Sequence, residues 1–381
     1  MVHTLNPVRG GPSESVRMFV LAHQRAGNEV EVATLDDPAA GFQTLANCPV
    51  HPCGPGRTNY GYSPPLEHWL RRNFTRFDGV IVNGVWQYHG VVARRVLAER
   101  KPYVVFAHGM LDPYFMRRYP LKHIKKLVYW LAAEQQNLKR AQAVCFTSQE
   151  ELRIAGEGFP FRDFRGVVIP YGTPGPTGEP AALKAAFAER LPALAGKLYF
   201  LFLGRIHAKK GCDLLLEAFA QTAPKEYSLV MAGPDETGLR PELEAQAARL
   251  GIADRVHWPG MLTGDTKWGA FYGAEAFVLP SHQENFGIAV ADALACGTIP
   301  LISDKVNIAE DVAGDGAALV EPDTLDGTRQ LMVRFLAMGA EERKNMSDSG
   351  IACYRRRYAL ANAATELYRA LELEADGGST S

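Results

Sequence analysis

Cationic side chains follow one apolar segment of the sequence in a pattern that suits an anion. Arg205, Lys209 and Lys210 come after the apolar run 198–203, and Gly211 then opens a helical pattern. The planar guanidinium of arginine can form bidentate hydrogen bonds with a diphosphate, and the lysine ammonium can bind it as a point charge. The N-terminus of a helix adds free N–H donors. The pattern predicts a diphosphate site at this connection, with a merely solvated charged loop as the alternative.

Two acids lie at a second helix start, in SHQENFGIAVADALACGTIP at residues 281–300. Glu284 belongs to the loop after the apolar run 276–281 and can accept hydrogen bonds from hydroxyl groups. Asp292 falls inside an apolar helix, where a charge needs a partner. That partner is either a ribose diol with two hydroxyl donors, or a backbone amide or buried Lys or Arg. The first N–H groups of this helix are expected to donate to phosphate or sugar oxygens, and they belong to Asn285, Phe286, Gly287 and Ile288.

Three further features lie in the first half of the chain. His108 directly follows the apolar run 102–107. It is predicted either to bind a ligand or to be an ordinary packed or surface histidine. Gly10 and Gly11 form a short glycine-rich loop before the first helical pattern, without the spacing of a dinucleotide fingerprint. Trp86, after another strand-like run, is predicted either to stack on an acceptor sugar or to pack in the core.

Strand-like runs alternate with helical patterns along the whole chain, which predicts an α/β fold with parallel sheets. The segment 170–180 is rich in Pro and Gly, which predicts a linker between two such domains. We expect an N-terminal Rossmann-like domain over 1–173 and a C-terminal one over 174–354, with a helix at 355–373 packing back on the first. Ligands of doubly wound sheets bind at the carboxyl ends of the strands, so both sets of ends are expected to face a central cleft.

Composition narrows the classes of function. The 381 residues are 47% hydrophobic and carry a formal net charge of −1, which excludes the global basic surface typical of nucleic-acid binding. The six cysteines show no C-x-x-C pair, which favours reduced, buried thiols. No signal peptide or membrane-spanning run is evident, and a cytoplasmic location is expected.

The helical pattern at 117–140 combines apolar and basic residues. Basic residues beside apolar and aromatic ones can settle on anionic lipid, so peripheral membrane contact is one hypothesis and a helix packed on its own domain is the other. The apolar positions on one side are Leu121, Ile124, Leu127, Val128 and Leu131. The basic residues toward the other side are Arg117, Arg118, Lys122, Lys125 and Lys126.

Together these motifs resemble the retaining glycosyltransferases of family 4, which have the GT-B architecture of two Rossmann-like domains. The resemblance covers nearly the whole chain. It rests on GGPSESV (10–16), AHGMLDP (107–113), FLGRIHAKKGCDLLLEAF (202–219) and PSHQENFGIAVADALACGTIPL (280–301). The HGMLDP stretch is similar to that of members involved in polysaccharide and exopolysaccharide assembly.

The resemblance implies a role for each candidate residue. Arg205 and Lys210 would hold the donor diphosphate, while Glu284 and His108 would contact the donor sugar. Asp292 stands where the family has a second glutamate that binds the ribose, which puts the nucleotide geometry slightly in question. The remaining implied donor contacts are Gly10, Gly11, Gly204, Gly260, Met261, Leu262, Asn285, Phe286, Gly287 and Ile288.

The implied reaction moves a hexose from a nucleoside diphosphate sugar, with UDP-glucose as the first candidate and GDP-mannose as the second, to a glycan or lipid-linked acceptor. No Asp-x-Asp and no zinc spacing occurs in the sequence, so neither a metal nor another cofactor is expected to be required. Four alternatives stay open. A nucleotide-sugar epimerase or hydrolase would keep the fold, a binding module would lack catalysis, and a glycoside hydrolase would leave Arg205 and Lys210 without a role.

Overall fold

The computed structural model describes residues 1–6, 11–42, 46–113, 120–160 and 163–372. The chain divides into two α/β units, Met1–Gly172 with Leu360–Ser381, and Thr173–Ala359. The first crossing falls inside the segment 170–180 that is predicted as the linker. The predicted returning helix begins later than 355, because the chain first makes a π-helical turn in the second unit, Tyr354–Tyr358, before α16 (Leu360–Leu371).

The first unit is built on parallel strands that run on both sides of Val2. Val2 bridges Thr34 on one side and Asn83 on the other, so it joins the pair β1-β2 to the sheet β3-β4-β5-β6. The strands are β1 (Val32–Thr34), β2 (Val50–Pro52), β3 (Val80–Asn83), β4 (Tyr103–Phe106), β5 (Ala143–Phe146) and β6 (Gly166–Val168). Strand β2 was not predicted, because its three residues are only half-buried and include no apolar run.

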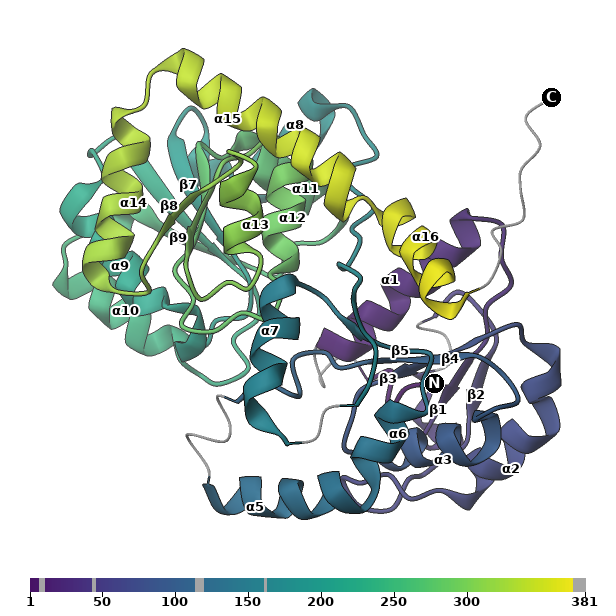
Figure 1. The fold of residues 1–381 in the computed structure, drawn as a ribbon. Coiled ribbons are helices and arrows are strands. Elements are labelled where there is room, and N and C mark those ends of the chain that lie inside the picture. Colours follow the sequence, from purple (N-terminus) through teal and green to yellow (C-terminus); the bar gives the residue numbers. More distant parts are fainter. Residues whose placement is uncertain (7–10, 43–45, 114–119, 161–162, 373–381) are drawn as a thin grey trace, which may run out of the picture. The chain divides into compact units, whose positions relative to one another are not determined.

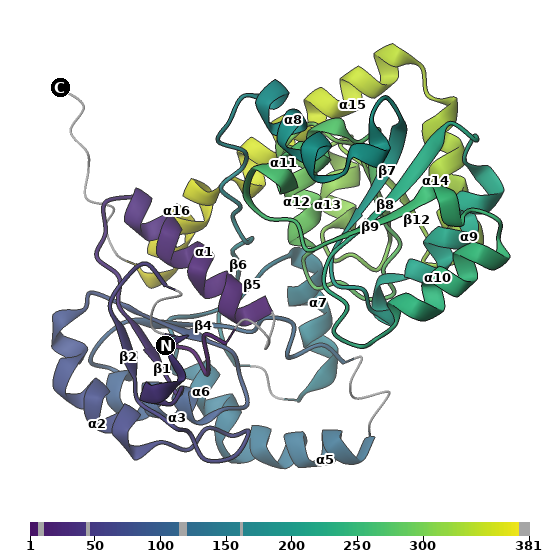
Figure 2. The same ribbon diagram turned by 180° about the vertical axis from the view of Figure 1, so that it is seen from behind.

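Helices cover both faces of this sheet. Figures 1 and 2 show α1 and α16 on one face and α2, α3 and α6 on the other. The helices besides α16 are α1 (Gly11–Arg25), α2 (Pro64–Asn73), α3 (Tyr88–Leu97), α5 (Pro120–Tyr129), α6 (Gln135–Lys139) and α7 (Gln149–Gly158). Because both faces are covered, β4 and β5 are buried along their whole length, which explains their continuous apolar sequences.

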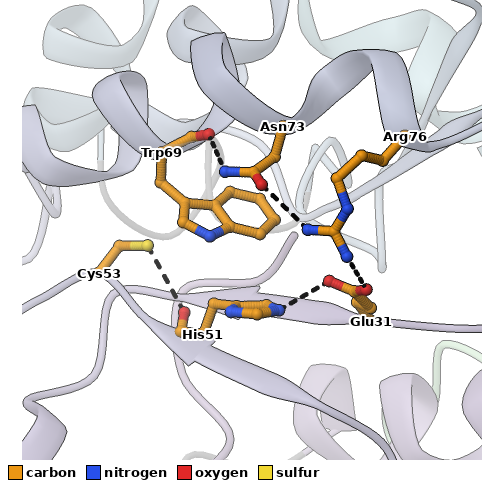
Figure 3. Close-up of polar contacts among 6 residues, drawn as sticks. All are labelled: Glu31, His51, Cys53, Trp69, Asn73 and Arg76. Carbon is orange, nitrogen blue, oxygen red and sulfur yellow. Dashed lines mark hydrogen bonds and ion pairs between the residues drawn. The ribbon is translucent and has the colours of Figure 1, made fainter.

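A polar cluster fixes the β1–β2 edge to α2 and the turn after it (Figure 3). Glu31 lies between the His51 ring and the Arg76 guanidinium, with His51 Nε2 2.7 Å from the carboxylate. Arg76 also donates to Asn73, and the His51 ring lies 4.7 Å from that of Trp69. Each polar member therefore has a partner in the cluster, and its role is to position α2 on this edge.

The second unit is a six-stranded parallel sheet in the order β12-β11-β10-β7-β8-β9. This is the doubly wound order, in which the chain starts in the middle, moves to one edge, and returns to build the other half. The strands are β7 (Leu198–Leu203), β8 (Tyr227–Ala232), β9 (Val256–Gly260), β10 (Ala276–Leu279), β11 (Pro300–Ser303) and β12 (Leu319–Glu321). The first five match predicted strands, and β12 was not predicted.

The helices of this unit also form two layers. Figures 1 and 2 show α9, α10 and α14 on one side of the sheet and α8, α11, α12 and α13 on the other. Their bounds are α8 (Pro180–Arg190), α9 (Cys212–Thr222), α10 (Arg240–Arg249), α11 (Gly264–Gly273), α12 (Ile288–Ala295), α13 (Ala309–Gly314), α14 (Leu325–Ala337) and α15 (Ala340–Cys353). Both units are thus Rossmann-like α/β layers, as the sequence predicts.

Candidate functional site

The order of strands in the second unit points to one place for a ligand. Strands β7 and β10 are neighbours, and the chain leaves them toward opposite halves of the sheet. Ligands of doubly wound sheets bind beside the carboxyl ends of the strands at such a switch point. The segments that follow these two strands are 204–211 and 280–287. They contain Arg205, Lys210 and Glu284, the charged residues that the sequence singles out for the diphosphate and the transferred sugar.

The segment after β7 approaches the segment after β10 through Gly211. Gly211 has a φ of 63°, and a Cβ atom added to it would lie 2.2 Å from the carbonyl oxygen of Pro280. Only glycine fits such a backbone conformation and such an approach. Just before it, the His207 side chain accepts a hydrogen bond from the N–H of Lys209 at 3.1 Å and so begins a tight 3-10 turn.

Hydrogen bonds join the two segments directly. The N–H of His282 donates to the carbonyl of Lys209 at 2.8 Å, and the Lys209 ammonium donates to Gln283 Oε1 at 2.9 Å. Glu284 is held on the other side, because its N–H donates to the carbonyl of Lys305 at 3.0 Å. The backbone on both sides of the switch point is therefore braced before any ligand binds.

Lys210 and Glu284 form an ion pair at this place, and both side chains are largely shielded from solvent. The sequence predicts each as a site residue but does not predict that they touch. Burial, reinforced by the positive charges of Arg205 and Lys209, lowers the pKa of Lys210 to about 8. Positive charges are thus close together here, and a bound anion would reduce the repulsion among them.

Two more basic side chains surround this pair. Arg205 is exposed and lies 3.5 Å from the carboxylate of Glu236, so its guanidinium has only a weak surface partner. Burial, followed by the charges of Arg205, Lys209 and Lys210, lowers the pKa of His207, which is neutral at pH 7. From the sequence, Lys209 counts among the cations of this loop, but the diphosphate is assigned to Arg205 and Lys210, and His207 is not named.

Helix α12 begins beside the same segment. Gly287, with a φ of 79°, is the residue before the first turn, and Ile288 opens the helix. Asn285 accepts a hydrogen bond from the Asn307 side chain at 3.4 Å. Phe286 is buried and packs its ring at 5.5 Å from that of Tyr358, so only its backbone can serve a ligand. The use of these backbone groups by a ligand stays a prediction.

Asp292 already has partners within the protein. It is only 3% exposed, and its carboxylate accepts hydrogen bonds from Thr173 Oγ1 at 2.5 Å and from Lys267 Nζ at 3.0 Å. Lys267 in turn lies 3.8 Å above the ring of Trp268. Of the two partners that the sequence left open, the structure therefore supplies a lysine, with a threonine beside it.

The ends of β7, β8 and β9 meet through glycines. A Cβ atom on Gly233 would lie 1.8 Å from the carbonyl oxygen of Gly204, and the N–H of Gly233 donates to Gly260 at 2.9 Å. Beyond Gly260, Met261 is strongly exposed and Leu262 is buried. Of these two implied donor contacts, only Met261 has a side chain that is open to a ligand.

The first unit has its own switch point, between Val2 and β3. Asn83 ends β3, and His108 follows the neighbouring strand β4. His108 and Gly109 have φ values of 51° and 72°, in a turn closed by a hydrogen bond from Met110 N–H to the carbonyl of Ala107. A non-glycine residue with positive φ next to a ligand-binding edge is a strained feature of the kind that accumulates at functional sites.

The other predicted residues of the first unit are placed as follows. Gly10 lies outside the described residues, and Gly11 is the first residue of α1. The Trp86 indole N–H donates to the carbonyl of Met110 at 3.0 Å, and its ring lies 4.9 Å from that of Phe159. Trp86 is therefore partly used in packing, which is one of the two roles the sequence left open.

Among the residues that the structure describes, no group of three or more His, Cys, Asp or Glu side chains is placed to hold a metal ion. Within the same ranges, no helix combines the length and apolar character needed to cross a bilayer.

Two family models match the chain, one in each unit. Residues 185–352 match the model described as glycosyl transferases group 1, and residues 10–172 match a glycosyl transferase 4-like domain. A D-inositol 3-phosphate glycosyltransferase from Geodermatophilus obscurus is 30% identical over 194 residues, which are 49% of this chain and 43% of that relative. One from Xylanimonas cellulosilytica is 35% identical over 159 residues, 39% of this chain and 37% of the relative. The chain thus matches less than half of the length of either relative.

Solved structures resemble nearly the whole chain. Anabaena HepE in complex with UDP and glucose has a TM-score of 0.74 at 16% identity, over 97% of this chain and 98% of that one. A sucrose-phosphate synthase from Thermosynechococcus elongatus has a TM-score of 0.70 at 20% identity, over 95% and 94% of the two chains. At these identities the likeness shows that the fold is shared.

Proposed function

We propose that this chain, whose two units match the models of a glycosyl transferase 4-like domain and of group 1 glycosyl transferases in a GT-B fold, is a retaining, nucleotide-sugar-dependent hexosyltransferase of polysaccharide biosynthesis. It moves a hexose from a nucleoside diphosphate sugar to a hydroxyl group of a glycan or lipid-linked acceptor. The observation that carries this proposal is the braced, cationic pair of segments at the β7/β10 switch point, where Lys210 lies against Glu284.

The donor diphosphate is assigned to Arg205 and Lys210. In the transition state the sugar gains positive charge and the departing diphosphate gains negative charge. Preorganised cations and helix N–H groups stabilise that second charge most effectively where water is partly excluded. Lys210 meets this demand, because it is largely shielded and is held in place before the ligand arrives. Donor binding replaces the Lys210–Glu284 contact with a contact between Lys210 and phosphate, and frees the Glu284 carboxylate for sugar hydroxyls.

Transfer with retention is proposed to occur on one face of the sugar. The bond between the anomeric carbon and the phosphate oxygen breaks, and the bond to the acceptor oxygen forms on the same side. The departing phosphate takes the acceptor's proton. A double displacement would instead need a carboxylate nucleophile at the anomeric carbon. Glu284 is poorly suited to that role, because the carboxylate that donor binding frees is assigned to the ring hydroxyls of the sugar and not to its anomeric carbon.

Two of the proposed donor contacts need a rearrangement. Asp292 can bind ribose hydroxyls only if it exchanges the hydrogen bond of Thr173 or of Lys267. His108 can bind a sugar hydroxyl through its ring only if it exchanges one of its two side-chain partners, Asn83 and Tyr171. We keep UDP-glucose as the first donor candidate and GDP-mannose as the second.

The proposal is tested first with a panel of nucleotide sugars. A donor that binds only the native state raises the melting temperature of the protein, and the rise grows with the logarithm of donor concentration over Kd. We expect UDP-glucose or GDP-mannose to raise it more than the matching free hexose. The binding donor is then incubated alone and with an acceptor glycan. Epimerised or hydrolysed sugar without acceptor would identify the other two reactions of this fold, and glycoside formed only with acceptor is the expected result.

A membrane surface is the partner proposed for α5. Leu127 and Trp130 face the core of the first unit, whereas Ile124, Val128 and Leu131 are 57%, 64% and 52% exposed. The spacing of four and three residues places the exposed side chains in one stripe.

Positive charge lies beside this stripe. The sequence from 120 to 133 contains no acid, and Lys125 is exposed next to the apolar side chains. An apolar stripe flanked by positive charge suits the inner face of an anionic membrane, where a lipid-linked acceptor would be found. Arg117 and Arg118 lie outside the described residues.

Sedimentation with lipid vesicles tests this partner. Replacing Ile124, Val128 and Leu131 by serine removes about 3 kcal/mol of apolar transfer energy, or roughly a 100-fold loss of binding to vesicles with anionic lipid. Val333→Ser is the control, because Val333 is 52% exposed on α14 and lies outside the stripe. Equal binding of the triple variant and the control, or equal binding to neutral vesicles, would remove the membrane from the proposal.

A further inference from the structure

The His108 imidazole is enclosed by side chains from different parts of the first unit. Its Nδ1 is hydrogen-bonded to the hydroxyl of Tyr171, and its Nε2 lies 3.0 Å from Oδ1 of Asn83. The ring also stacks on Phe106 at 5.6 Å and on Tyr171 at 5.8 Å. Both ring nitrogens are therefore used, and the ring plane is fixed.

The partners determine which nitrogen carries the proton. The Asn83 amide nitrogen donates to the carbonyl of Met1 at 3.3 Å, so the amide oxygen is the atom that faces His108. An amide oxygen only accepts, so Nε2 must be the protonated nitrogen and Nδ1 the acceptor. Nδ1 then accepts from the Tyr171 hydroxyl, which receives a hydrogen bond from Ser15 on α1. Each link in this chain has one donor and one acceptor.

The surroundings keep the ring uncharged. Burial lowers the pKa of His108 to about 3. The carboxylate of Glu151 contacts the same turn, where it accepts hydrogen bonds from the N–H of Gly109 and from Thr147. His89, which donates to the carbonyl of Asn83 at 2.9 Å, is itself buried, and its pKa is lowered to about 3. Tyr171 faces the ring as a neutral phenol, because burial raises its pKa.

We propose that Asn83 and Tyr171 are positioning residues that hold His108 as the neutral Nε2–H tautomer before a donor binds, so that His108 is uncharged and does not accept the proton of the acceptor hydroxyl. The assignment of this role to the transfer reaction rests on the proposed function. The tautomer itself follows from the hydrogen bonds alone. Asn83 ends β3 and Tyr171 follows β6, so the pair reaches His108 from two strand ends.

Nitrogen NMR of the imidazole tests the tautomer without any substrate. With His108 assigned by comparison with His108→Ala, we expect a protonated Nε2 and an unprotonated Nδ1 from pH 8 down to pH 5. Asn83→Asp places a carboxylate against Nε2–H, and we expect it to turn His108 into an imidazolium near neutral pH. An Nδ1–H tautomer, or a wild-type ring that titrates between pH 5 and 7, would overturn the proposal.

Tyr171→Phe is the second variant and keeps the ring in place. Nδ1 then loses its donor, and we expect a shifted Nδ1 resonance together with a roughly tenfold lower kcat/KM for transfer. Tyr103→Phe is the matched control, because Tyr103 is buried on β4 and its hydroxyl donates to the carbonyl of Asn137 at 3.0 Å. The control should leave the His108 resonances and the kinetics unchanged. A Tyr171→Phe protein that behaves like the control contradicts the positioning role.

The two failures can be told apart. If the protein transfers no sugar but shows the Nε2–H tautomer and its response to Asn83→Asp, the hydrogen-bond assignment holds and the proposed function fails. If transfer occurs and its pH profile shows an ionisation between pH 5 and 7 that disappears in His108→Ala, His108 acts as a base and the inference fails alone.

Discussion

Lys210 is the side chain on which the proposed donor site depends most. It combines partial burial, neighbouring positive charge and one acidic partner, Glu284. A buried charge is tolerated only with such a partner, and removal of either member leaves the other one uncompensated. The ion pair therefore keeps the lysine charged and in place while the donor is absent.

Replacing Lys210 by Met should lower kcat/KM for transfer by roughly 100-fold to 1000-fold, the usual effect of losing one preorganised group that stabilises the leaving charge. The measurement is steady-state kinetics with the donor found in the panel. Lys344→Met is the control, since Lys344 is an exposed lysine of the same unit that pairs with Asp348 on the surface. If both variants transfer at the wild-type rate, the diphosphate is not bound by Lys210.

Donor affinity should also fall as the pH rises above about 8. The pKa of Lys210 is lowered to about 8, so its ammonium loses its proton in this range and the site loses one positive charge. The sign is the same for any anionic ligand, because only the protonated form attracts it. Titration calorimetry between pH 7 and 9.5 measures the change. Lys210→Arg keeps its charge over this range and should abolish the alkaline fall; a fall that persists in this variant has another origin.

At the scale of elements, the site depends on how closely the segments after β7 and β10 approach each other. Gly211 makes the approach possible. Two hydrogen bonds maintain it, one from the His282 N–H to the Lys209 carbonyl and one from the Lys209 ammonium to Gln283. The N-terminus of α12 follows the second segment directly. A change that separates the segments should therefore remove donor binding without touching a charged residue.

Gly211→Ala tests this point. Any alanine at positive φ costs about 1–2 kcal/mol, and here the Cβ also meets the Pro280 carbonyl, which adds roughly 1–3 kcal/mol. Gly251→Ala is the matched control, because Gly251 has a φ of 69° and nothing within 4 Å of an added Cβ. We expect both variants to melt earlier and only Gly211→Ala to lose donor binding in the thermal shift. Equal donor affinity in the two proteins would show that the approach is not required.

At the scale of the whole molecule, each unit carries a switch point with functional candidates at its strand ends. His108 and Asn83 lie at that of the first unit, and Lys210 and Glu284 at that of the second. We propose that cationic side chains and helix N–H groups match the donor charge and provide what a divalent ion provides in other transferases. The six cysteines are free and have no part in either group of residues.

Transfer should accordingly proceed without an added metal. After dialysis against EDTA, we expect the rate with the identified donor and acceptor to be unchanged, since Lys210 and Arg205 neutralise the diphosphate themselves. The rate is measured before and after dialysis and again with added Mg²⁺. Activity that vanishes with the chelator and returns with Mg²⁺ would show that the cationic side chains are insufficient.

Local sequence patterns predicted most of the elements and named the residues of the candidate site, whose roles stay predictions. The apolar run at 198–203 coincides with β7, and the helix after Gly287 coincides with α12. Both rest on short-range physics, because buried parallel strands need continuous apolar residues and helices begin at recognisable residues. The same reasoning missed β2 and β12, which have three residues each and too little apolar sequence to stand out.

The sequence by itself determined which residues can do chemistry, and the tertiary structure decided which of them meet. Lys210 and Glu284 touch because β7 and β10 are neighbours, and sheet order is a long-range property that no local pattern carries. The hydrogen bonds of Asp292 with Lys267 and Thr173 also depend on long-range packing, because these residues lie far apart in the sequence. Likewise, the amphipathic pattern at 117–140 could not show that Leu127 faces the core while Ile124 and Val128 face outward. That depends on how much of the helix the rest of its unit covers.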